Sequence, residues 1–372
     1  MMLALTAESM LLDGLEIAGA VVLIEDARVR AIGSREALEV PHKARLMEFG
    51  DALLAPGLLD VHVHGGAGQD FMSADSAGLA AIRAHLARHG VTRYLATTMT
   101  AGWEQTLEVV ARLAQAGLEL HLEGPFLNPK RRGAHPPEYL LEPSLEKLDQ
   151  LCEAAHGQIR LITIAPELPH ALEFIREATA RGIGISLGHS DSTLEQALAG
   201  VAAGARHVTH TFNAMAPLQQ RHPGLLGLAL TEPGLWAEII ADGVHVHPRL
   251  VGAFCRLKPE GKAILASDGI SAAGCGDGMF QLGPIQVRVM QGRCESNGSL
   301  AGSVLTLDGA VQNVMNFARL GVAEALTMAT RNPATLLRVQ PPQMAVGSAA
   351  DITVWTRAGA LRATFLAGQQ VH

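Results

Sequence analysis

The sequence lacks three features that would assign the protein to particular classes. No run of eighteen apolar residues is free of charged side chains, so we expect no membrane-spanning helix. Lysine and arginine form no cluster and the net charge is -7, which argues against a nucleic-acid-binding surface. The four cysteines stand too far apart for a zinc knuckle or a CxxC redox motif.

The sequence also lacks the features of a signal peptide and of a P-loop motif. The first residues, MMLALTAESMLLDG, have no cationic start and carry an early glutamate, so we predict no signal peptide. Isolated, reduced thiols fit a cytosolic protein, and we therefore expect a cytoplasmic location. The glycines between residues 65 and 68 are not followed by GK[ST], which excludes a P-loop at this position.

The two ends of the chain have a similar β-rich character. Hydrophobic residues make up 48% of the 372 residues, which is ample for one large domain, or one large and one small. Residues 1–53 contain short strand-like runs joined by turns, and so do the last thirty residues. We predict that residues 1–53 and 341–372 pair into one small β-sandwich domain.

The pattern changes between the two ends, where short apolar runs alternate with amphipathic stretches. Four of these stretches end in a glycine, as helices commonly do, and they span residues 76–90, 104–117, 168–182 and 192–204. The eight apolar runs begin near Leu58, Val91, Leu118, Ile159, Ile183, Arg206, Trp236 and Ala263. This alternation predicts an α/β fold, a (β/α)8 TIM-type barrel over residues 54–340, and an open doubly wound sheet is the alternative.

Polar residues at the ends of these runs favour the barrel and indicate its site. In a parallel barrel, such residues converge on one pocket at the carboxyl ends of the strands. His62 and His64 are two residues apart on one strand, so their side chains point to the same side. A metal-dependent hydrolase needs imidazoles and carboxylates of this kind. The residues in question are His62, His64, Glu123, His135, His189, His210, His245 and Asp268.

For two of these candidates, a histidine in the same apolar run is an alternative metal ligand. His121 precedes Glu123 by two residues and can share its face, but Glu123 lies nearer the carboxyl end of the strand. His207 competes with His210, but it begins its strand and would point away from the site. Asp268 is the last polar residue of the eighth run and is the expected proton shuttle. A phosphate site would need donors from elsewhere, such as Arg221, Asn213 and the backbone near Ala214.

Several motifs between about residues 50 and 340 resemble those of the N-acetylglucosamine-6-phosphate deacetylases of the amidohydrolase superfamily. They are PGLLDVHVHGG, HLEGPFLNPKRRGAH, SLGHSDST, HTFNAMAPLQQRHPG, IADGVHVHP and LAGSVLTLDGA. The resemblance implies a barrel with a small β-sandwich built from both termini. It also implies one divalent metal held by Glu123, His189 and His210, and a second that His62 and His64 can bind. We expect zinc, with iron, cobalt or manganese as alternatives.

The resemblance also implies roles for the remaining candidates. Asp268 matches the family's catalytic aspartate, and His135 matches the histidine that helps to polarise the acetyl carbonyl. His245, Arg221 and the Asn213–Ala214 backbone match contacts to the sugar phosphate. Because the family's arginine reaches in from a neighbouring subunit, a homodimer is expected. Gly269 follows Asp268 where relatives commonly have alanine, which leaves the fine sugar specificity open.

The predicted function is hydrolysis of N-acetyl-D-glucosamine 6-phosphate to D-glucosamine 6-phosphate and acetate. In this hypothesis a metal-bound hydroxide attacks the acetyl carbonyl, and Asp268 acts as general base and then as general acid. Alternatives are deacetylation of the galactosamine epimer, hydrolysis of another N-acyl amide, and a metal-binding barrel without catalysis. We expect neither nucleic acid nor a membrane among the partners.

Overall fold

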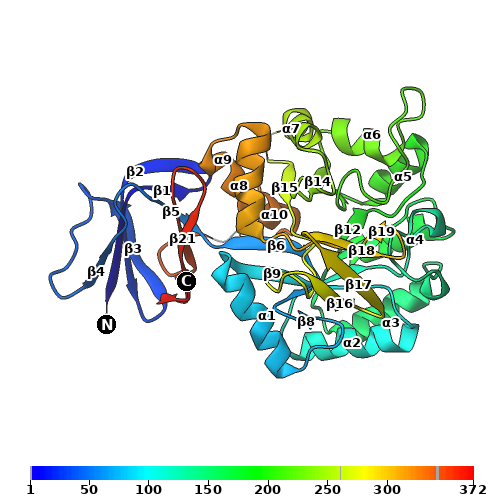
Figure 1. Cartoon of the computed structure of the whole chain (residues 1–372), viewed down its shortest axis with the longest axis horizontal. Helices are drawn as coiled ribbons and strands as arrows, with labels where there is room; N and C mark the ends of the chain where they lie inside the picture. Colours follow the sequence, from blue (N-terminus) through cyan, green and yellow to red (C-terminus); the bar gives the residue numbers. More distant parts are fainter. Residues whose placement is uncertain (1, 260, 341–342) are drawn as a thin grey trace.

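The computed structural model describes residues 2–259, 261–340 and 343–372, which form a barrel and a separate sheet beside it (Figure 1). Both ends of the chain lie in the separate sheet, at the left of Figure 1. Among the described residues, no helix has the length and apolar character needed to cross a membrane.

The barrel wall consists of eight strands, and each is parallel to its neighbours. Their spatial order follows their order in the chain, without the reversal that an open doubly wound sheet requires. The barrel prediction is therefore confirmed, and each strand begins at or within two residues of the predicted start. The strands are β6 (Leu58–Val63), β9 (Val91–Thr98), β10 (Leu120–Glu123), β11 (Ile159–Ile164), β12 (Gly184–Leu187), β13 (His207–Val208), β14 (Trp236–Ile239) and β15 (Ala263–Leu265).

The barrel closes just beyond the end of β15. The Asp268 amide donates to the carbonyl oxygen of His62 at 2.9 Å, and the His64 amide donates to the carbonyl oxygen of Gly269 at 2.7 Å. The segment around Ser303 then pairs with the same residues, and the Ser303 amide donates to the Asp268 carbonyl oxygen at 2.7 Å. Residues 268 and 269 are thus held from both sides at the mouth of the barrel.

Helices surround the barrel and carry the expected end signals. The glycines that end the four predicted helices, at positions 90, 117, 182 and 204, all have positive φ angles, which glycine adopts without steric cost. Thr193 and Gln196 form a capping box at the start of α5. The helices are α1 (Ser76–Arg88), α2 (Trp103–Gln115), α3 (Leu145–Ala155), α4 (Ala171–Ala180), α5 (Leu194–Ala203), α6 (Gly224–Thr231), α7 (Pro248–Leu257), α8 (Leu307–Ala318), α9 (Val322–Thr327) and α10 (Arg331–Leu336).

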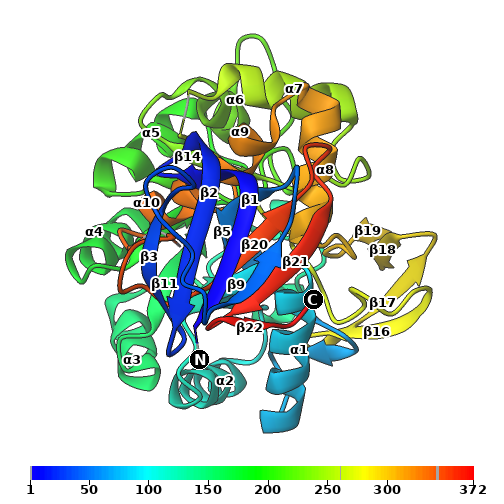
Figure 2. The ribbon, with the colours of Figure 1, turned by 90° about the vertical axis from the view of Figure 1, so that its left-hand side faces the viewer.

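An antiparallel meander between β15 and α8 was not predicted. It consists of β16 (Gly278–Leu282), β17 (Ile285–Met290), β18 (Arg293–Ser296) and β19 (Ser299–Leu300). Figure 2 shows it projecting from the side of the barrel. Asp70, in the short strand β8 (Gln69–Asp70) that pairs with β7 (Gly65–Gly66), accepts the Gly283 amide at 2.7 Å and the Met72 amide at 2.6 Å. This carboxylate ties the meander to the loop that follows His64.

The strands at the two chain ends form the separate sheet, here called the terminal sheet. They enclose an apolar core that includes Leu5, Val22, Leu54, Val354 and Phe365. The strands are β1 (Leu3–Leu12), β2 (Leu15–Glu25), β3 (Arg28–Ser34), β4 (Arg45–Glu48), β5 (Leu53–Pro56), β20 (Ile352–Trp355), β21 (Leu361–Leu366) and β22 (Gln369–Gln370). Hydrogen bonds connect all eight strands into one continuous sheet built from both termini, where a small β-sandwich of the two termini was predicted.

The exact division of the chain stays a prediction. The proposed boundary at residue 341 lies outside the described residues, and the boundary at residue 53 falls at the start of β5, which pairs with both β1 and β20.

Gly302→Ala should destabilise the protein, because Gly302 packs against residues 268–270, where the barrel closes. Gly302 has a φ of 58°, and a Cβ there would overlap Ile270 Cγ2 and lie 3.0 Å from the Asp268 carbonyl oxygen. Left-handed backbone and overpacking together predict a loss of about 2–5 kcal/mol in the free energy of unfolding, measured in urea. Gly298→Ala is the control, because Gly298 has a φ of 79° but no atom within 4 Å of the added Cβ. Equal losses in the free energy of unfolding in the two variants would show that close packing of Gly302 against residues 268–270 does not matter for stability.

Candidate metal and catalytic site

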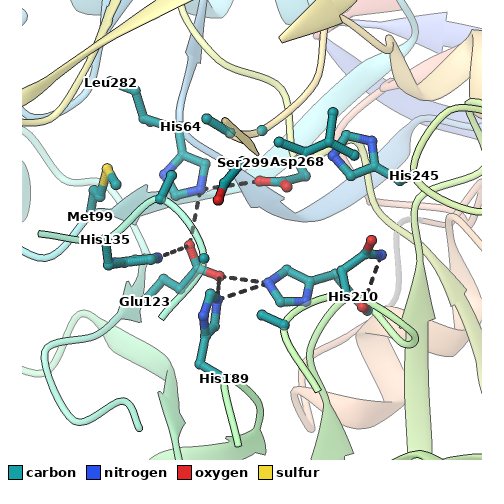
Figure 3. Close-up of a pocket in the computed structure, with 17 residues that line it drawn as sticks. His64, Met99, Glu123, His135, His189, His210, His245, Asp268, Leu282 and Ser299 are labelled. Atoms are coloured by element: carbon teal, nitrogen blue, oxygen red, sulfur yellow. Dashed lines mark hydrogen bonds and ion pairs between the residues drawn. The ribbon is translucent and has the colours of Figure 1, made fainter. Parts of the chain in front are cut away.

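A cavity of about 280 Å³ opens at the carboxyl ends of the barrel strands. Figure 3 shows imidazole and carboxylate groups from several different strands pointing into it. The meander contributes apolar and hydroxyl groups to the opposite wall. The lining residues are His64, Met99, Glu123, Gly133, Ala134, His135, His189, His210, Asn213, Ala214, His245, Asp268, Leu282, Ser299, Leu300, Ala301 and Gly302.

Glu123, the last residue of β10, lies at the centre of the site. Its Oε1 is 3.0 Å from His189 Nε2 and 3.0 Å from His210 Nε2, and these two nitrogens are 3.0 Å from each other. His189 follows β12 and His210 follows β13, so three strand ends deliver one ligand atom each. The three atoms form a compact set that is able to hold one cation.

A second set lies directly beside the first. Asp268 Oδ1 is 3.2 Å from His64 Nε2 and 3.5 Å from His62 Nε2. The other oxygen of Glu123, Oε2, lies 3.3 Å from His64 Nε2. Glu123 therefore borders both sets, which are Glu123 with His189 and His210, and His62 with His64 and Asp268.

Hydrogen bonds to the far nitrogens orient two of these imidazoles. His62 Nδ1 donates to the Glu238 carboxylate at 2.7 Å, and His189 Nδ1 donates to the Arg131 carbonyl oxygen at 2.9 Å. Because these acceptors carry no proton, the hydrogen must lie on Nδ1 when the ring is neutral. The Nε2 lone pair of each ring then faces the cavity, as a metal ligand requires.

The site concentrates negative potential in a buried place. Burial disfavours the charged ring of His62, but attraction to Glu123, Glu238 and Asp268 exceeds this effect and holds the pKa of His62 well above its ordinary value. Burial would likewise raise the pKa of Glu123, but His62 and the hydrogen bonds from the other imidazoles hold it well below its ordinary value. Burial lowers the pKa of His189 to about 4, so this ring is neutral at neutral pH.

These residues fit a divalent cation on their own chemistry. His62 Nε2 is buried without a hydrogen-bond partner, although it faces two carboxylates at 3.5 Å. An unpaired polar atom in such a place is costly unless another group satisfies it. Neutral imidazoles with one or two carboxylates suit zinc and related transition metals. Both sets are therefore suitable for a cation of this class.

The backbone at the site is held in an uncommon conformation. His189, His210, Ala214 and Asp268 have φ angles of 48°, 25°, 50° and 48°. Left-handed backbone costs about 1–2 kcal/mol for a residue with a side chain. Such residues persist where the surrounding structure enforces them, and they cluster at functional sites.

His135 and His245 line the cavity outside the two ligand sets. Thr100 holds His135 Nδ1, with its hydroxyl oxygen at 2.8 Å and its amide donating at 3.4 Å, and His135 Nε2 lies 3.4 Å from Glu123 Oε2. His245 Nδ1 donates to the Asp242 carboxylate at 2.7 Å. Both rings thus have fixed orientations at the cavity wall.

The two rival histidines belong to the barrel interior. His121 Nδ1 lies 3.0 Å from the Val61 carbonyl oxygen and its Nε2 lies 2.8 Å from Thr163 Oγ1, so both nitrogens are already paired. His207 lies 3.6 Å from Glu238 Oε2 and neither residue set that could hold a metal includes it. The geometry therefore favours Glu123 and His210 over these rivals.

The structure separates the candidate phosphate contacts. Asn213 and Ala214 line the cavity, as His245 does. Arg221 is exposed on the loop before α6 and is not among the lining residues of its own chain. The single chain thus brings together all the predicted site residues except Arg221.

Sequence reasoning missed several residues that shape the site. Glu238 holds His62, Thr100 orients His135, and Leu282, Ser299 and Leu300 form the wall from the meander. One signal was available for Glu238, because a carboxylate inside the apolar run WAEII needs a buried partner. Of the meander residues, Leu300 begins the motif LAGSVLTLDGA, but Leu282 and Ser299 carried no signal in the sequence.

Comparison with known proteins places the chain among characterised relatives. The model of the amidohydrolase family matches residues 53–371. N-acetylgalactosamine-6-phosphate deacetylase from Escherichia coli O157:H7 is 36% identical over 326 residues, which cover 85% of this chain and 86% of the relative. N-acetylglucosamine-6-phosphate deacetylase from Vibrio furnissii is 35% identical over 363 residues, which cover 94% of this chain and 90% of the relative.

Solved structures agree over the whole chain. A mutant N-acetyl-D-glucosamine-6-phosphate deacetylase from Mycobacterium smegmatis, in complex with N-acetyl-D-glucosamine-6-phosphate, matches with a TM-score of 0.94 at 32% identity. That match covers 100% of this chain and 99% of the other. The N-acetylglucosamine-6-phosphate deacetylase from Thermotoga maritima matches with a TM-score of 0.86 at 28% identity, covering 100% of this chain and 99% of the other.

Proposed function

The chain belongs to the amidohydrolase family, and we propose that it removes the acetyl group from N-acetyl-D-glucosamine 6-phosphate. The products are acetate and D-glucosamine 6-phosphate. The observation that carries the proposal is the convergence of Glu123, His189 and His210 within 3.0 Å of one another, beside a carboxylate and a histidine that face the same cavity. Relatives that act on this substrate support the choice of sugar.

We further propose that Glu123, His189 and His210 hold one divalent cation and that His62 and His64 help to hold a second. When bound, such a cation polarises a carbonyl oxygen and makes water a stronger nucleophile at neutral pH. Zinc suits these ligands best, and iron, cobalt and manganese accept the same donor types. The chain's own residues then orient the amide and move the protons.

Asp268 is the group placed to move protons. Its carboxylate lines the cavity at the end of β15, and backbone hydrogen bonds from both neighbouring segments hold it there. It accepts a proton from the attacking water and delivers it to the amine as the C–N bond breaks. One carboxylate can serve both steps because the proton that it accepts in the first step is the proton that it gives up in the second.

His135 and the cavity wall stabilise and orient the substrate. His135 presents its Nε2–H to the cavity, where it donates to the oxygen of the acetyl carbonyl as negative charge develops. His245 and Asn213 line the cavity, and we propose that they contact the sugar phosphate. Arg221 is exposed in its own chain, so we propose that it completes the phosphate site of a second copy in a homodimer.

The galactosamine epimer is the second candidate substrate. A relative that is 36% identical to the chain carries the name N-acetylgalactosamine-6-phosphate deacetylase. The two sugars differ only in the orientation of one hydroxyl group, and the acetamide and the phosphate are common to both. The roles proposed for the metal, for Asp268 and for His135 are therefore the same with either epimer.

Acetate release tests the proposed function directly. The purified protein should release acetate from N-acetyl-D-glucosamine 6-phosphate, lose this activity on chelation, and regain it when zinc, cobalt or manganese is added back. The unphosphorylated sugar and the galactosamine 6-phosphate epimer are the comparison substrates. Faster turnover of the epimer would make N-acetyl-D-galactosamine 6-phosphate the preferred substrate. No turnover of any sugar by the metal-loaded protein would reject the proposal.

Asp268→Asn should separate chemistry from metal binding. The amide side chain has nearly the same shape but accepts no proton at neutral pH, so kcat should fall by about 10²–10⁴, the usual range for a general acid–base group. Elemental analysis should still find at least one ion per chain, since Glu123, His189 and His210 are intact, whereas the second set contains Asp268 and can lose its ion. Nearly normal kcat in this variant would exclude Asp268 as the proton shuttle.

Arg221→Ala should raise KM for the phosphorylated sugar by roughly 10- to 100-fold, the loss expected for one hydrogen bond to a charged group. Turnover of the unphosphorylated sugar should change little. Gln220→Ala, an exposed neighbour on the same loop, is the control. Sedimentation of the unmodified protein as a monomer, or equal effects on both sugars, would remove Arg221 from the phosphate site.

A further inference from the structure

Glu238 is a carboxylate that lies wholly inside the barrel and that the proposed chemistry does not use. It is in β14, its relative exposure is 0%, and it does not line the cavity. Its Oε1 accepts two hydrogen bonds, from His62 Nδ1 at 2.7 Å and from the His210 amide at 2.8 Å. One oxygen atom therefore contacts a member of each ligand set.

The first of these bonds determines which nitrogen of His62 faces the cavity. Because Glu238 accepts at Nδ1, Nε2 points to Glu123 and Asp268, at 3.5 Å from each. A negative partner also makes the imidazole a stronger ligand. Without an acceptor at this position, the ring could place its hydrogen on Nε2 and would then no longer bind a cation there.

The second bond fixes the backbone of His210. This residue has a φ of 25°, a conformation that residues with side chains rarely adopt. Its amide donates to Glu238 Oε1, and the next amide, that of Thr211, donates to the main-chain oxygen of Glu238 at 2.8 Å. Glu238 thus holds two successive amides and directs His210 Nε2 towards Glu123.

We propose that Glu238 is a positioning residue that couples the two ligand sets, because a single carboxylate oxygen orients His62 in one and His210 in the other. The inference rests on the proposed metal dependence and is independent of which sugar is hydrolysed. Its consequence is that binding of a cation at one set helps to organise the other.

A role in packing alone does not account for this residue. A buried carboxylate is costly, and an apolar side chain of similar size commonly replaces buried charge without loss of stability. The second oxygen, Oε2, is buried without a hydrogen-bond partner and lies 3.6 Å from His207 Nε2. All the conventional hydrogen bonds of the carboxylate are therefore made by Oε1, to the two ligand residues.

Two substitutions distinguish the effect of the hydrogen-bond acceptor of Glu238 from the effect of its negative charge. Glu238→Gln keeps an oxygen that can accept from His62 and His210, and its amide group can face the unpaired His207 nitrogen. Glu238→Leu removes both the acceptor and the charge at similar volume. Thr163→Val is the matched control, because Thr163 is buried in the same interior and its side chain bonds to His121 and Thr209 but to no side chain of the six ligand-set residues.

The experiment measures metal stoichiometry by elemental analysis and zinc affinity by competition with a chromogenic chelator, on the full chain. For Glu238→Leu we expect zinc affinity to fall by about 10- to 100-fold, the usual effect of losing an outer-shell partner, with fewer ions bound per chain. Glu238→Gln should lose less than Glu238→Leu. Thr163→Val should lower the melting temperature and leave zinc affinity unchanged.

The outcomes distinguish this inference from the proposed function. If Glu238→Leu and Glu238→Gln fold and bind zinc as tightly as the unmodified protein, Glu238 is only structural and the coupling is wrong. If Glu238→Leu does not fold, Glu238→Met takes its place, because it also removes the acceptor but has a more adaptable side chain, and zinc affinity equal to that of Thr163→Val then also rejects the inference. If the unmodified protein itself binds no cation, the proposed function fails first.

Discussion

The attraction between buried carboxylates and imidazoles is the interaction on which this site depends. Glu123 faces five histidines within 3.5 Å, and its position between the two sets brings them into one cluster. Groups of this kind are stable in a barrel interior only when each charge has a partner. A cation is a further partner for the same atoms, and the rigid barrel holds those atoms in place before it binds.

The barrel also explains why residues far apart in sequence can form such a cluster. The six ligand-set side chains come from the carboxyl ends of β6, β10, β12, β13 and β15 or from just beyond them, and parallel pairing places these ends at one level. Closure of the sheet at residues 268 and 269 is the step that joins the last strand to the first. Asp268 thereby comes to lie next to His62 and His64, although about two hundred residues separate them in the chain.

Much of this arrangement could be predicted from sequence, for physical reasons that also explain the failures. Apolar runs mark buried parallel strands, and the glycines that end four helices have the positive φ that such ends favour. The preference for Glu123 over His121 rested on its place nearer the carboxyl end of the strand, and the packing of neighbouring strands adds the reason that Thr163 and Val61 already satisfy His121. Glu238 was missed because its partners come from β6 and β13. The meander was missed because its alternating, half-exposed strands do not follow the strand–helix repeat of the barrel.

The terminal sheet has a consequence for the order in which the protein is made. β5 pairs with β20, and Thr353 donates a hydrogen bond to the carbonyl oxygen of Ala55 across a separation of 298 residues. At roughly 5–20 residues per second, β5 waits on the order of 15–60 seconds on the ribosome before its partner is synthesised. An unpaired strand edge can pair with other chains during this interval. The segment that connects the two parts of the protein is therefore the one most exposed to misassembly during translation, although it is wholly buried in the finished molecule.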